Sequence, residues 1–393
     1  MSRHEHPRPV ARRVALWATI TAASAVAATA IVGGLIALIF ARTVVTPPRK
    51  RDESLRILSH DETTITMSPS LDSLIPGTYS LWFNQDRGHA RIGEIVAYST
   101  TSVTRQLLDV ARGSLRGVSR GRIGGWFFLG PAELGFGYTD VAVDTELGPA
   151  PAWLIPAEHP STRWMIGVHG RAVRREEALR AVPAFREAGF TSLLVSYRND
   201  GDAPASSDQR YSLGDREWKD VEAAVRYAVE HGAEQIVLMG WSMGGSIVLQ
   251  IVTRSPVAHH IHGVVLDSPV VDWITALRYQ GIARRLPRSV TLAMMWMLSH
   301  AWSRALTGQA HPIDFDRLNM VSRARELDLP ILLLHSVDDG SIPATASRAL
   351  AAARPDIVTY EEFTTARHTR LWNYDPDRWN LALRRWLSGL GAP

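Results

Sequence analysis

The chain has 393 residues, 46% of them hydrophobic, so it can bury a full core in one large domain with an extension or in two domains. Its net charge of +4 comes from arginines scattered along the chain, which excludes the concentrated basic stripe typical of nucleic-acid binding. The absence of cysteine excludes disulfides, thiolate metal sites and a cysteine nucleophile.

The first informative segment is an apolar run near the amino terminus. Residues 14–40 contain no charged side chain, and Arg12, Arg13 and Arg42 bracket them as interface anchors would. A helix needs about 20 apolar residues to cross a bilayer, whereas the apolar core of a signal peptide spans only about 7–15. We therefore expect a tail at residues 1–13 and a transmembrane helix at residues 14–41. The alternative is a cleaved signal sequence with cut sites in the alanine-rich stretch 22–30.

The orientation of this helix depends on the charges at its two ends. The flanking cations nearly balance: Arg3, Arg8, Arg12 and Arg13 precede the helix, and Arg42, Arg49, Lys50 and Arg51 follow it. The amino terminus adds a positive charge to the first group. We therefore expect a single-pass membrane protein whose globular part lies outside the cytoplasm.

Residues 42–138 are expected to form a linker and a small β-rich extension. The stretches 63–67, 78–83 and 91–98 alternate in character and are separated by turn signals such as Pro76-Gly77. Residues 112–137 are rich in glycine and arginine, and no element is predicted there.

Residues 139–393 alternate between strands and helices, the pattern of an α/β fold with a mostly parallel central sheet and helices on both faces. The segments 141–144 and 152–155 are expected to open the sheet as an antiparallel pair. The expected buried strands are 164–168, 192–196, 235–239, 264–266, 331–334 and 357–360, and the expected helices are 174–188, 215–231, 246–253, 344–353 and 376–390.

A long insertion interrupts this alternation at about residues 270–328. Its segments 271–285 and 290–306 have helical character and include large apolar residues such as Met294, Trp296 and Trp302. A long insertion at the carboxyl edge of a sheet usually covers a site. We expect a helical cap whose apolar residues pack it onto the domain; a surface that faces substrate or membrane is the alternative.

The motif that carries chemistry is Gly240-Trp241-Ser242-Met243-Gly244. It follows the strand 235–239 and opens a helix, which is the strand–turn–helix setting of a nucleophile elbow. Such a sharp turn lifts the middle side chain above the sheet, and tight packing around it requires small residues at Gly240 and Gly244. Ser242 is therefore the predicted nucleophile.

A serine hydroxyl needs a base, and the base needs an acid to orient it. In this kind of sheet they follow the serine in the order acid, then histidine. His368 is the single histidine after Asp339 and falls between the last strand and the last helix, so it is the predicted base. Asp339 is the predicted acid, because a helix restarts soon after it. Asp338, Asp267 and Asp272 are the alternatives.

Acyl transfer also requires hydrogen-bond donors aimed at the oxyanion that develops on the substrate. The backbone N–H of Met243, which follows the nucleophile, is the first predicted donor. The second is the backbone N–H of Arg171, in the loop after the strand 164–168. The preceding pair, His169-Gly170, favours a tight turn that lets backbone approach the substrate, and His169 is expected to be structural.

From about residue 139 to 390 the chain resembles the α/β-hydrolase superfamily, in particular its esterase and prolyl-oligopeptidase-like branches. This resemblance implies hydrolysis of esters, thioesters or peptides through an acyl-enzyme, without a metal or organic cofactor. It does not extend to residues 1–138. Two departures are Arg171, where many lipases have further glycines, and Ser336, where glycine is usual. The residues that carry the resemblance are His169-Gly170, 240–245, Asp339, Ile342-Pro343 and His368.

Three functions are compatible with these features. The first is hydrolysis of carboxylic esters or thioesters on Ser242, with a small-molecule or lipid-like acyl substrate, as the membrane helix and apolar cap suggest. The second is a peptidase of the prolyl-oligopeptidase type, in which Glu176-Glu177 would read a peptide amino terminus. The third is a non-catalytic scaffold at the membrane, against which the intact order of serine, acid and histidine argues. We expect no cofactor, no metal and no nucleic-acid partner.

Overall fold

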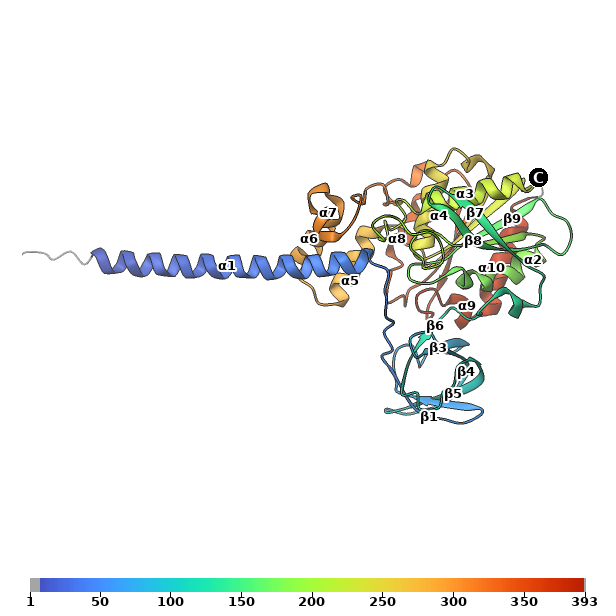
Figure 1. The fold of residues 1–393 in the computed structure, drawn as a ribbon, viewed down its shortest axis with the longest axis horizontal. Helices are drawn as coiled ribbons and strands as arrows, with labels where there is room; N and C mark the ends of the chain where they lie inside the picture. The colour runs from blue at the N-terminus through green and yellow to red at the C-terminus, as the bar shows by residue number, and fades with distance from the viewer. Residues whose placement is uncertain (1–7, 392–393) are drawn as a thin grey trace, which may run out of the picture.

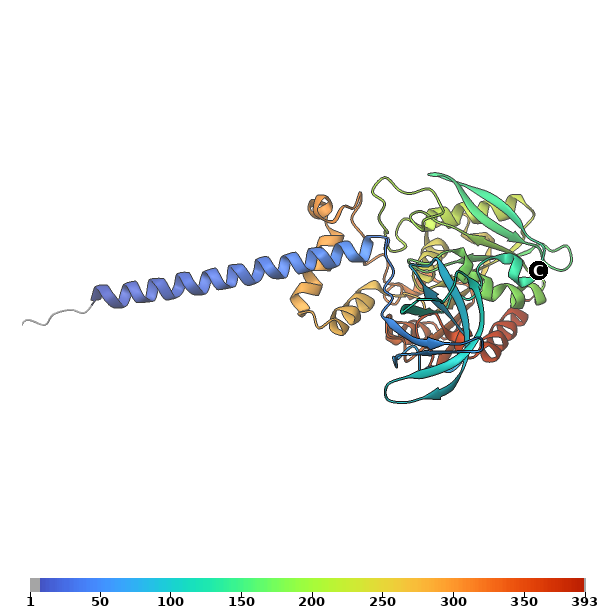
Figure 2. The same ribbon diagram turned by 60° about the horizontal axis from the view of Figure 1, so that its bottom comes forward.

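The computed structural model describes residues 8–391, which form a long helix, a small barrel and an α/β domain (Figure 1). Helix α1 (Arg8–Val45) projects away from the rest of the molecule, and its carboxy-terminal end lies against the α/β domain (Figures 1 and 2). The barrel follows α1 in the chain and packs beside the sheet of the α/β domain.

The β-rich extension is a closed antiparallel barrel with the strand order β1-β2-β5-β4-β3-β6. The expected strands 63–67, 78–83 and 91–98 correspond to β2, β3 and β4. Inside the barrel the buried Arg105 side chain donates to the carbonyls of Ile75, Gly77 and Gly93 at 2.6–2.8 Å, so its polar atoms are satisfied without a carboxylate. The strands are β1 (Leu55–His60), β2 (Thr64–Met67), β3 (Tyr79–Phe83), β4 (Gly88–Tyr98), β5 (Val103–Arg112) and β6 (Arg120–Gly124).

The α/β domain is built on an eight-stranded mixed sheet with the order β14-β13-β12-β11-β9-β10-β8-β7. The first strands pair antiparallel (β7 with β8, and β8 with β10), and the remaining neighbours are parallel. Strands β10, β11 and β13 are buried along their whole length, as parallel strands covered on both faces must be. The strands are β7 (Thr139–Thr145), β8 (Gly148–Ile155), β9 (Arg163–Val168), β10 (Thr191–Val195), β11 (Gln235–Trp241), β12 (Ile261–Asp267), β13 (Ile331–Ser336) and β14 (Val358–Phe363).

Helices cover both faces of this sheet and close two apolar cores. The helices α3, α4 and α8 contribute to one core, and α2 and α10 contribute to the other. The expected helix 174–188 begins as a 3-10 segment, η2 (Arg175–Ala181), because Pro183 has no N–H to continue an α-helical ladder backwards. The α-helices are α2 (Val182–Glu187), α3 (Trp218–Glu230), α4 (Met243–Arg254), α8 (Thr345–Ala353), α9 (Leu371–Tyr374) and α10 (Pro376–Gly389).

The insertion between β12 and β13 forms the cap. Its helices are α5 (Trp273–Ala283), α6 (Arg288–Ser299) and α7 (Arg304–Thr307). Asp272 caps α5 by accepting hydrogen bonds from the N–H groups of Ile274 and Thr275, so it has a structural role. The expected helix 290–306 is interrupted after Ser299, where the Ser299 and His300 side chains both bond to the Trp296 carbonyl and compete with the helix.

Helix α1 contains the one segment of the described chain, Ala27–Val45, that is long and apolar enough to cross a membrane. Its last turns are covered by protein: Ala37, Ala41 and Val45 are fully buried against the cap and the domain. The Arg42 Nε–H donates to the carbonyl of Leu306 at 2.7 Å, and the Val45 carbonyl accepts from the N–H of Tyr211 at 2.8 Å. The helix is therefore joined to both the cap and the domain.

Candidate active site

The turn between β11 and α4 holds Ser242 in the strained geometry of a nucleophile elbow. Its backbone has φ 51° and ψ −115°, a conformation that residues other than glycine rarely adopt. A Cβ atom on Gly240 would lie 2.6 Å from the carbonyl carbon of Gly244, and one on Gly244 would lie 2.2 Å from the carbonyl oxygen of Val168. Both glycines are thus required by close backbone packing, as expected from the motif.

The structure brings Ser242, His368 and Asp339 together at the carboxyl edge of the sheet. The Ser242 Oγ lies 2.9 Å from His368 Nε2, and His368 Nδ1 lies 2.6 Å from Asp339 Oδ2. His368 comes from the loop between β14 and α9, and Asp339 from the loop after β13. Three side chains that are up to 126 residues apart in sequence therefore form one continuous chain of hydrogen bonds.

Asp339 is held as a buried carboxylate. Its Oδ1 accepts from the N–H groups of Ser341 and Ile342 at 2.8 Å each, and its Oδ2 lies 3.2 Å from Nε2 of His335. Burial alone would raise the pKa of Asp339, but His368 and His335 hold it well below its usual range. An ionised Asp339 is an acceptor only, so Nδ1 of His368 carries the proton and Nε2 is free to accept from Ser242.

The two alternative acids nearby occupy other positions. Asp338 is exposed and lies 3.6 Å from Arg367 Nη1. Asp267 is fully buried at the end of β12 and accepts from the Ser268 hydroxyl and from Nε1 of Trp379. Burial raises the pKa of Asp267, so it does not match the ionised carboxylate that the imidazole needs.

The surroundings of His368 give its imidazole a raised pKa, which suits a general base. Burial favours its neutral form, but the charge of Asp339 and the hydrogen bond to it outweigh this and raise the pKa of His368 above its ordinary value. The imidazole therefore accepts a proton more readily than a free histidine does, while its partner keeps the ring oriented.

The two expected oxyanion donors are the backbone N–H groups of Met243 and Arg171. Neither the N–H of Met243, at the first turn of α4, nor the N–H of Arg171 has an acceptor among residues 8–391. A Cβ on Gly170 would lie 3.2 Å from the Ser242 Cβ, so this loop passes close to Ser242. The Gly170 N–H is held by Glu177 Oε2 at 2.7 Å. Within the described chain, both expected donors are thus free to bind another acceptor.

The supporting roles of two residues were not predicted from the sequence. Glu177 was considered only as a reader of a peptide amino terminus, but it is buried in η2 and anchors the loop at Gly170. His335, the last but one residue of β13, contacts Asp339, but an isolated histidine within a strand does not reveal its partner. His169 has the structural role expected of it, because its Nε2 contacts Asp200 at 3.1 Å and its ring stacks on Tyr197.

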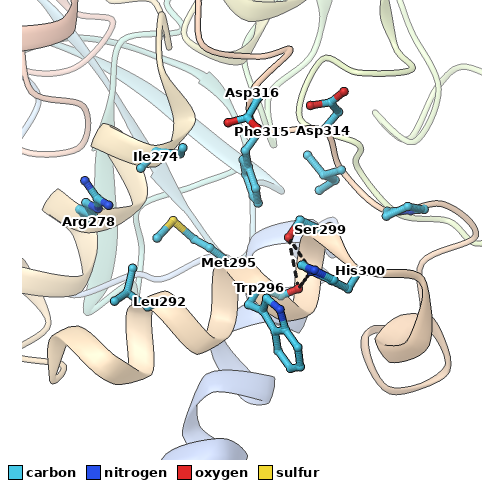
Figure 3. Close-up of a pocket in the computed structure, with 12 residues that line it drawn as sticks. Ile274, Arg278, Leu292, Met295, Trp296, Ser299, His300, Asp314, Phe315 and Asp316 are labelled. Carbon is cyan, nitrogen blue, oxygen red and sulfur yellow. Dashed lines mark hydrogen bonds between the residues drawn. The ribbon is translucent and has the colours of Figure 1, made fainter.

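A cavity of about 260 Å³ opens at Ser242 and His368. Val44 brings α1 into its wall, and Trp273 and Leu277 bring in α5. A larger cavity, of about 610 Å³, lies within the cap among α5, α6 and residues 312–316 (Figure 3), and it shares no lining residue with the first. The smaller cavity is therefore the candidate active site. Its lining residues are Val44, Arg171, Ser242, Trp273, Leu277, Gln280, Ala283, Arg284, Gly340, Ser341, Ile342 and His368.

Comparison with known proteins agrees with this geometry. A model of the alpha/beta hydrolase family matches residues 165–380, more than half of the chain, and the chain belongs to that family. Residues 56–124, which form most of the barrel, match a model described as a domain of unknown function (DUF8805). No curated protein matches the chain.

Among solved structures, the esterase Pf2001 of Pyrococcus furiosus has a TM-score of 0.52 at 18% identity, covering 67% of this chain and 98% of the esterase. The esterase RhEst1 from Rhodococcus sp. ECU1013 has a TM-score of 0.44 at 18% identity, with coverages of 65% and 99%. A monoacylglycerol lipase from Paleococcus ferrophilus has a TM-score of 0.43 at 18% identity, with coverages of 62% and 99%. The likeness to Pf2001 shows that the fold is shared.

Proposed function

We propose that this protein is a serine hydrolase that cleaves carboxylic esters or thioesters through an acyl-enzyme on Ser242. The observation that carries the proposal is the continuous hydrogen-bonded chain from the Ser242 hydroxyl through His368 to the buried Asp339. A serine hydroxyl beside an imidazole base, and an ionised, acceptor-only carboxylate that orients this base, are the two conditions that nucleophilic catalysis by serine requires.

The reaction proceeds in two balanced halves. The Ser242 Oγ attacks the substrate carbonyl carbon, and His368 Nε2 takes the hydroxyl proton. The carbon–oxygen or carbon–sulfur bond then breaks, and the same proton passes to the departing alcohol or thiol. A water molecule then attacks the acyl-enzyme carbonyl and gives one proton to His368. The bond from the carbonyl carbon to Ser242 Oγ breaks, His368 returns the proton to Oγ, and the carboxylic acid is released. The N–H groups of Met243 and Arg171 donate to the oxyanion formed in each half.

A fluorophosphonate probe tests the nucleophile. We expect the full-length chain in detergent micelles to be labelled, and Ser242→Ala to abolish labelling. Ser341→Ala is the matched control, because Ser341 lines the same cavity and its variant should still be labelled. The full chain is needed, since removal of residues 1–50 would delete Val44 from the cavity wall. An unlabelled parent protein would favour the scaffold alternative, and labelling of Ser242→Ala would identify a different nucleophile.

Esters are favoured over peptides by the contacts of Glu177. This carboxylate accepts from the Gly170 N–H and lies 3.6 Å from Nη2 of Arg180, so Glu177 is not free to read a peptide amino terminus. We expect p-nitrophenyl esters to be hydrolysed and aminoacyl amides of the same acyl group to be left intact. Faster cleavage of the amides would favour the prolyl-oligopeptidase-like alternative.

We further propose that α1 spans a membrane and that the catalytic domain lies outside the cytoplasm. The length and composition of the helix support the span, and the four arginines that precede it support the orientation. Because the chain has no cysteine, Tyr98→Cys places a single thiol at an exposed position of the barrel. A membrane-impermeant maleimide should label this thiol in intact cells. Labelling only after the cells are permeabilised would indicate the opposite orientation, with the domain in the cytoplasm.

A further inference from the structure

The cavity at Ser242 carries an uncompensated positive charge. Arg171 and Arg284 both line it, and no aspartate or glutamate is among its twelve lining residues. Within the described chain the Arg171 side chain makes no hydrogen bond or ion pair, and its guanidinium lies 5.9 Å from the Tyr211 ring centre. Arg284 makes one long hydrogen bond, 3.4 Å, to the carbonyl of Gln280, and lies over the Phe40 ring. Neither cation has a counter-ion.

Two other desolvated arginines of this protein show how such a charge is usually satisfied. Arg198 forms an ion pair of 2.6 Å with Asp220, and Arg105 donates to four backbone carbonyls. Removing an arginine from water costs free energy unless acceptors replace the lost solvent. Burial lowers the pKa of Arg171, an effect that the nearby tyrosines only partly oppose, although an arginine stays charged at any physiological pH. The Arg171 guanidinium is thus partly desolvated beside Ser242 and has no hydrogen-bond acceptor within the described chain.

A purely structural explanation accounts poorly for this arrangement. An arginine that only packs against Tyr211 would normally turn its polar end to a carbonyl or carboxylate, as Arg105 does. Arg171, in the loop after β9, and Arg284, at the end of α5, instead both line the cavity that contains Ser242 and His368. A planar guanidinium is well suited to bind carboxylate or phosphate oxygens in pairs.

We propose that Arg171 and Arg284 form an anion subsite, and that the substrate is an ester carrying a carboxylate or phosphate group close to the scissile bond. This inference rests on the proposed hydrolase function and names the class of its substrate. The cavity volume of about 260 Å³ limits the group held there to a small one. The carboxylate and the phosphate share the same recognition chemistry, and matched substrates distinguish them.

The experiment compares two pairs of esters with the full-length chain in detergent micelles. Monomethyl succinate against methyl butyrate tests a carboxylate, and 1-butyryl-glycerol 3-phosphate against 1-butyrylglycerol tests a phosphate. We expect the charged member of at least one pair to have the higher kcat/KM. Arg171→Gln and Arg284→Gln should each lower the charged-to-neutral ratio of kcat/KM by about 10- to 100-fold, the usual effect of a hydrogen bond to a charged group. Arg285→Gln is the control: Arg285 is exposed, adjacent and outside the cavity lining, so its ratio should match the parent.

The outcomes separate this inference from the proposed function. Preference for the phosphate or for the carboxylate supports the subsite and identifies the group it takes. Equal or faster hydrolysis of both neutral esters overturns the subsite while leaving the hydrolase function intact. A ratio that is unchanged in Arg171→Gln and Arg284→Gln also overturns it. If no ester is hydrolysed and fluorophosphonate does not label Ser242, the proposed function itself fails.

A second inference rests on a different observation, the surface of the cap. Between Trp273 and Ile313 the sequence has five arginines and no acidic residue. Within this stretch large apolar side chains are exposed, and in Figure 3 Trp296 and Leu292 lie on the opposite side of the larger cavity from Asp314 and Asp316. The exposed apolar residues of the cap are Ile282, Leu292, Trp296, Trp302 and Leu306. This combination of arginine, tryptophan and aliphatic residues is typical of a membrane interface.

The position of α1 supports a lipid bilayer as the occupant of this surface. Helix α1 packs along α6, and its exposed apolar residues continue the exposed side chains of the cap. From the exposed Trp17 to Ala37, the first of its described side chains to be buried, the helix rises about 30 Å at roughly 1.5 Å per residue, close to the ~30 Å of a hydrocarbon core. Trp17 and the tryptophans Trp296 and Trp302 would then mark the two interfaces.

We infer that the exposed face of the cap rests in the bilayer leaflet from which α1 emerges, with its arginines among anionic headgroups. Single-cysteine variants carrying an environment-sensitive fluorophore test this in nanodiscs that contain anionic and spin-labelled lipids. The spin-labelled lipids should quench the fluorophore at Leu292→Cys and leave the one at Leu381→Cys, an equally exposed leucine on α10, unquenched. Equal quenching at the two positions, or none at Leu292→Cys, would overturn the inference.

Discussion

The Asp339–His368 pair sets the pH dependence that we expect for the reaction. His368 must be neutral to accept the proton of Ser242, and Asp339 raises its pKa above the ordinary value of about 6.5. The rate should therefore fall as the pH drops through the raised pKa, with the inflection of kcat/KM above about 6.5. Asp339→Asn removes the charge that raises this pKa, so the inflection should move to lower pH. The variant should also lose about 10³- to 10⁴-fold in kcat, because the amide does not hold the required tautomer.

A pH profile of ester hydrolysis for the parent and both asparagine variants checks this. Asp338→Asn is the control, because Asp338 is exposed and does not contact the imidazole. Its profile should match that of the parent. An unmoved inflection in Asp339→Asn would show that another group orients His368.

Gly244 illustrates how tightly the elbow is packed. Gly244→Ala would bring a Cβ to 2.2 Å from the carbonyl oxygen of Val168, which is backbone and has no freedom to move aside. We expect a loss of about 2–3 kcal/mol in unfolding free energy, measured by denaturant unfolding. Gly389→Ala, at the end of α10 with nothing within 4 Å, is the matched control and should be neutral or slightly stabilising. Equal stability of the two variants would contradict the packing argument.

At this scale the sequence was informative where local patterns carry chemistry. The motif around Ser242, the order of the following residues and the position of His368 predicted side chains that the structure places within hydrogen-bonding distance. Glu177 and His335 were missed because their partners, Gly170 and Asp339, are recognisable only in three dimensions. The charge of Arg171 was missed for the same reason: a sequence does not show that no carboxylate faces a given arginine.

At the scale of elements, α1 forms part of the core and of the cavity wall. Phe40, Val44 and Val45 are buried in the main core, and Val44 lines the cavity at Ser242. The apolar periodicity near the amino terminus predicted a helix, but a uniformly apolar helix gives no sign of where lipid ends and protein begins. The interruption of the cap helix at His300 was equally hidden, since it arises from side-chain bonds to the Trp296 carbonyl.

Two truncations test whether α1 serves only as a membrane anchor or also supports the core and the cavity at Ser242. Deletion of residues 1–28 removes the amino-terminal half of α1 and keeps all of its described buried residues, and we expect hydrolysis of a soluble ester to persist. Deletion of residues 1–46 also removes Phe40, Val44 and Val45, at about 1.5–3 kcal/mol for each large apolar side chain. We expect a Tm lower by roughly 5–10 °C and a reduced kcat/KM. The comparison is made by thermal unfolding and ester assays on both proteins in detergent, and equal behaviour would assign α1 an anchoring role alone.

At the scale of the whole molecule, one hydrogen-bonded network joins the barrel, the segment after His368 and the loop at Gly170, which lie far apart in the sequence. Arg180 donates to the carbonyl of Thr369 and to Oδ1 of Asn373, at 2.8 Å each, and lies beside Glu177, which holds the oxyanion loop. Asn373 in turn exchanges two hydrogen bonds with Thr78 of the barrel, at 2.9 and 3.0 Å. The barrel therefore braces the segment that follows His368. The alternating pattern of residues 63–98 predicted strands there, but the closure of the barrel and its docking depend on distant pairings that no local pattern encodes.

Gly77 offers a way to test whether this brace positions the base. It has φ +112°, and a Cβ there would lie 2.2 Å from the carbonyl oxygen of Asn373. Gly77→Ala should push residues 369–374 away from the barrel and misplace His368. Since a misplacement of about 1 Å costs roughly 100-fold in rate, we expect kcat to fall at least about tenfold. Gly117→Ala is the control, because Gly117 also has positive φ, +73°, but has no atom within 4 Å of the added Cβ.

Both glycine variants strain the barrel backbone, by about 1–2 kcal/mol each, so a change in stability alone does not separate them. The decisive measurement is kcat for a neutral ester at a temperature where both variants are folded, together with the rate of fluorophosphonate labelling, which also depends on the base. A loss confined to Gly77→Ala would show that the barrel holds the catalytic histidine in register with Ser242. Equal rates in the two variants would mean that the loop of His368 keeps its position without the contact between Gly77 and Asn373.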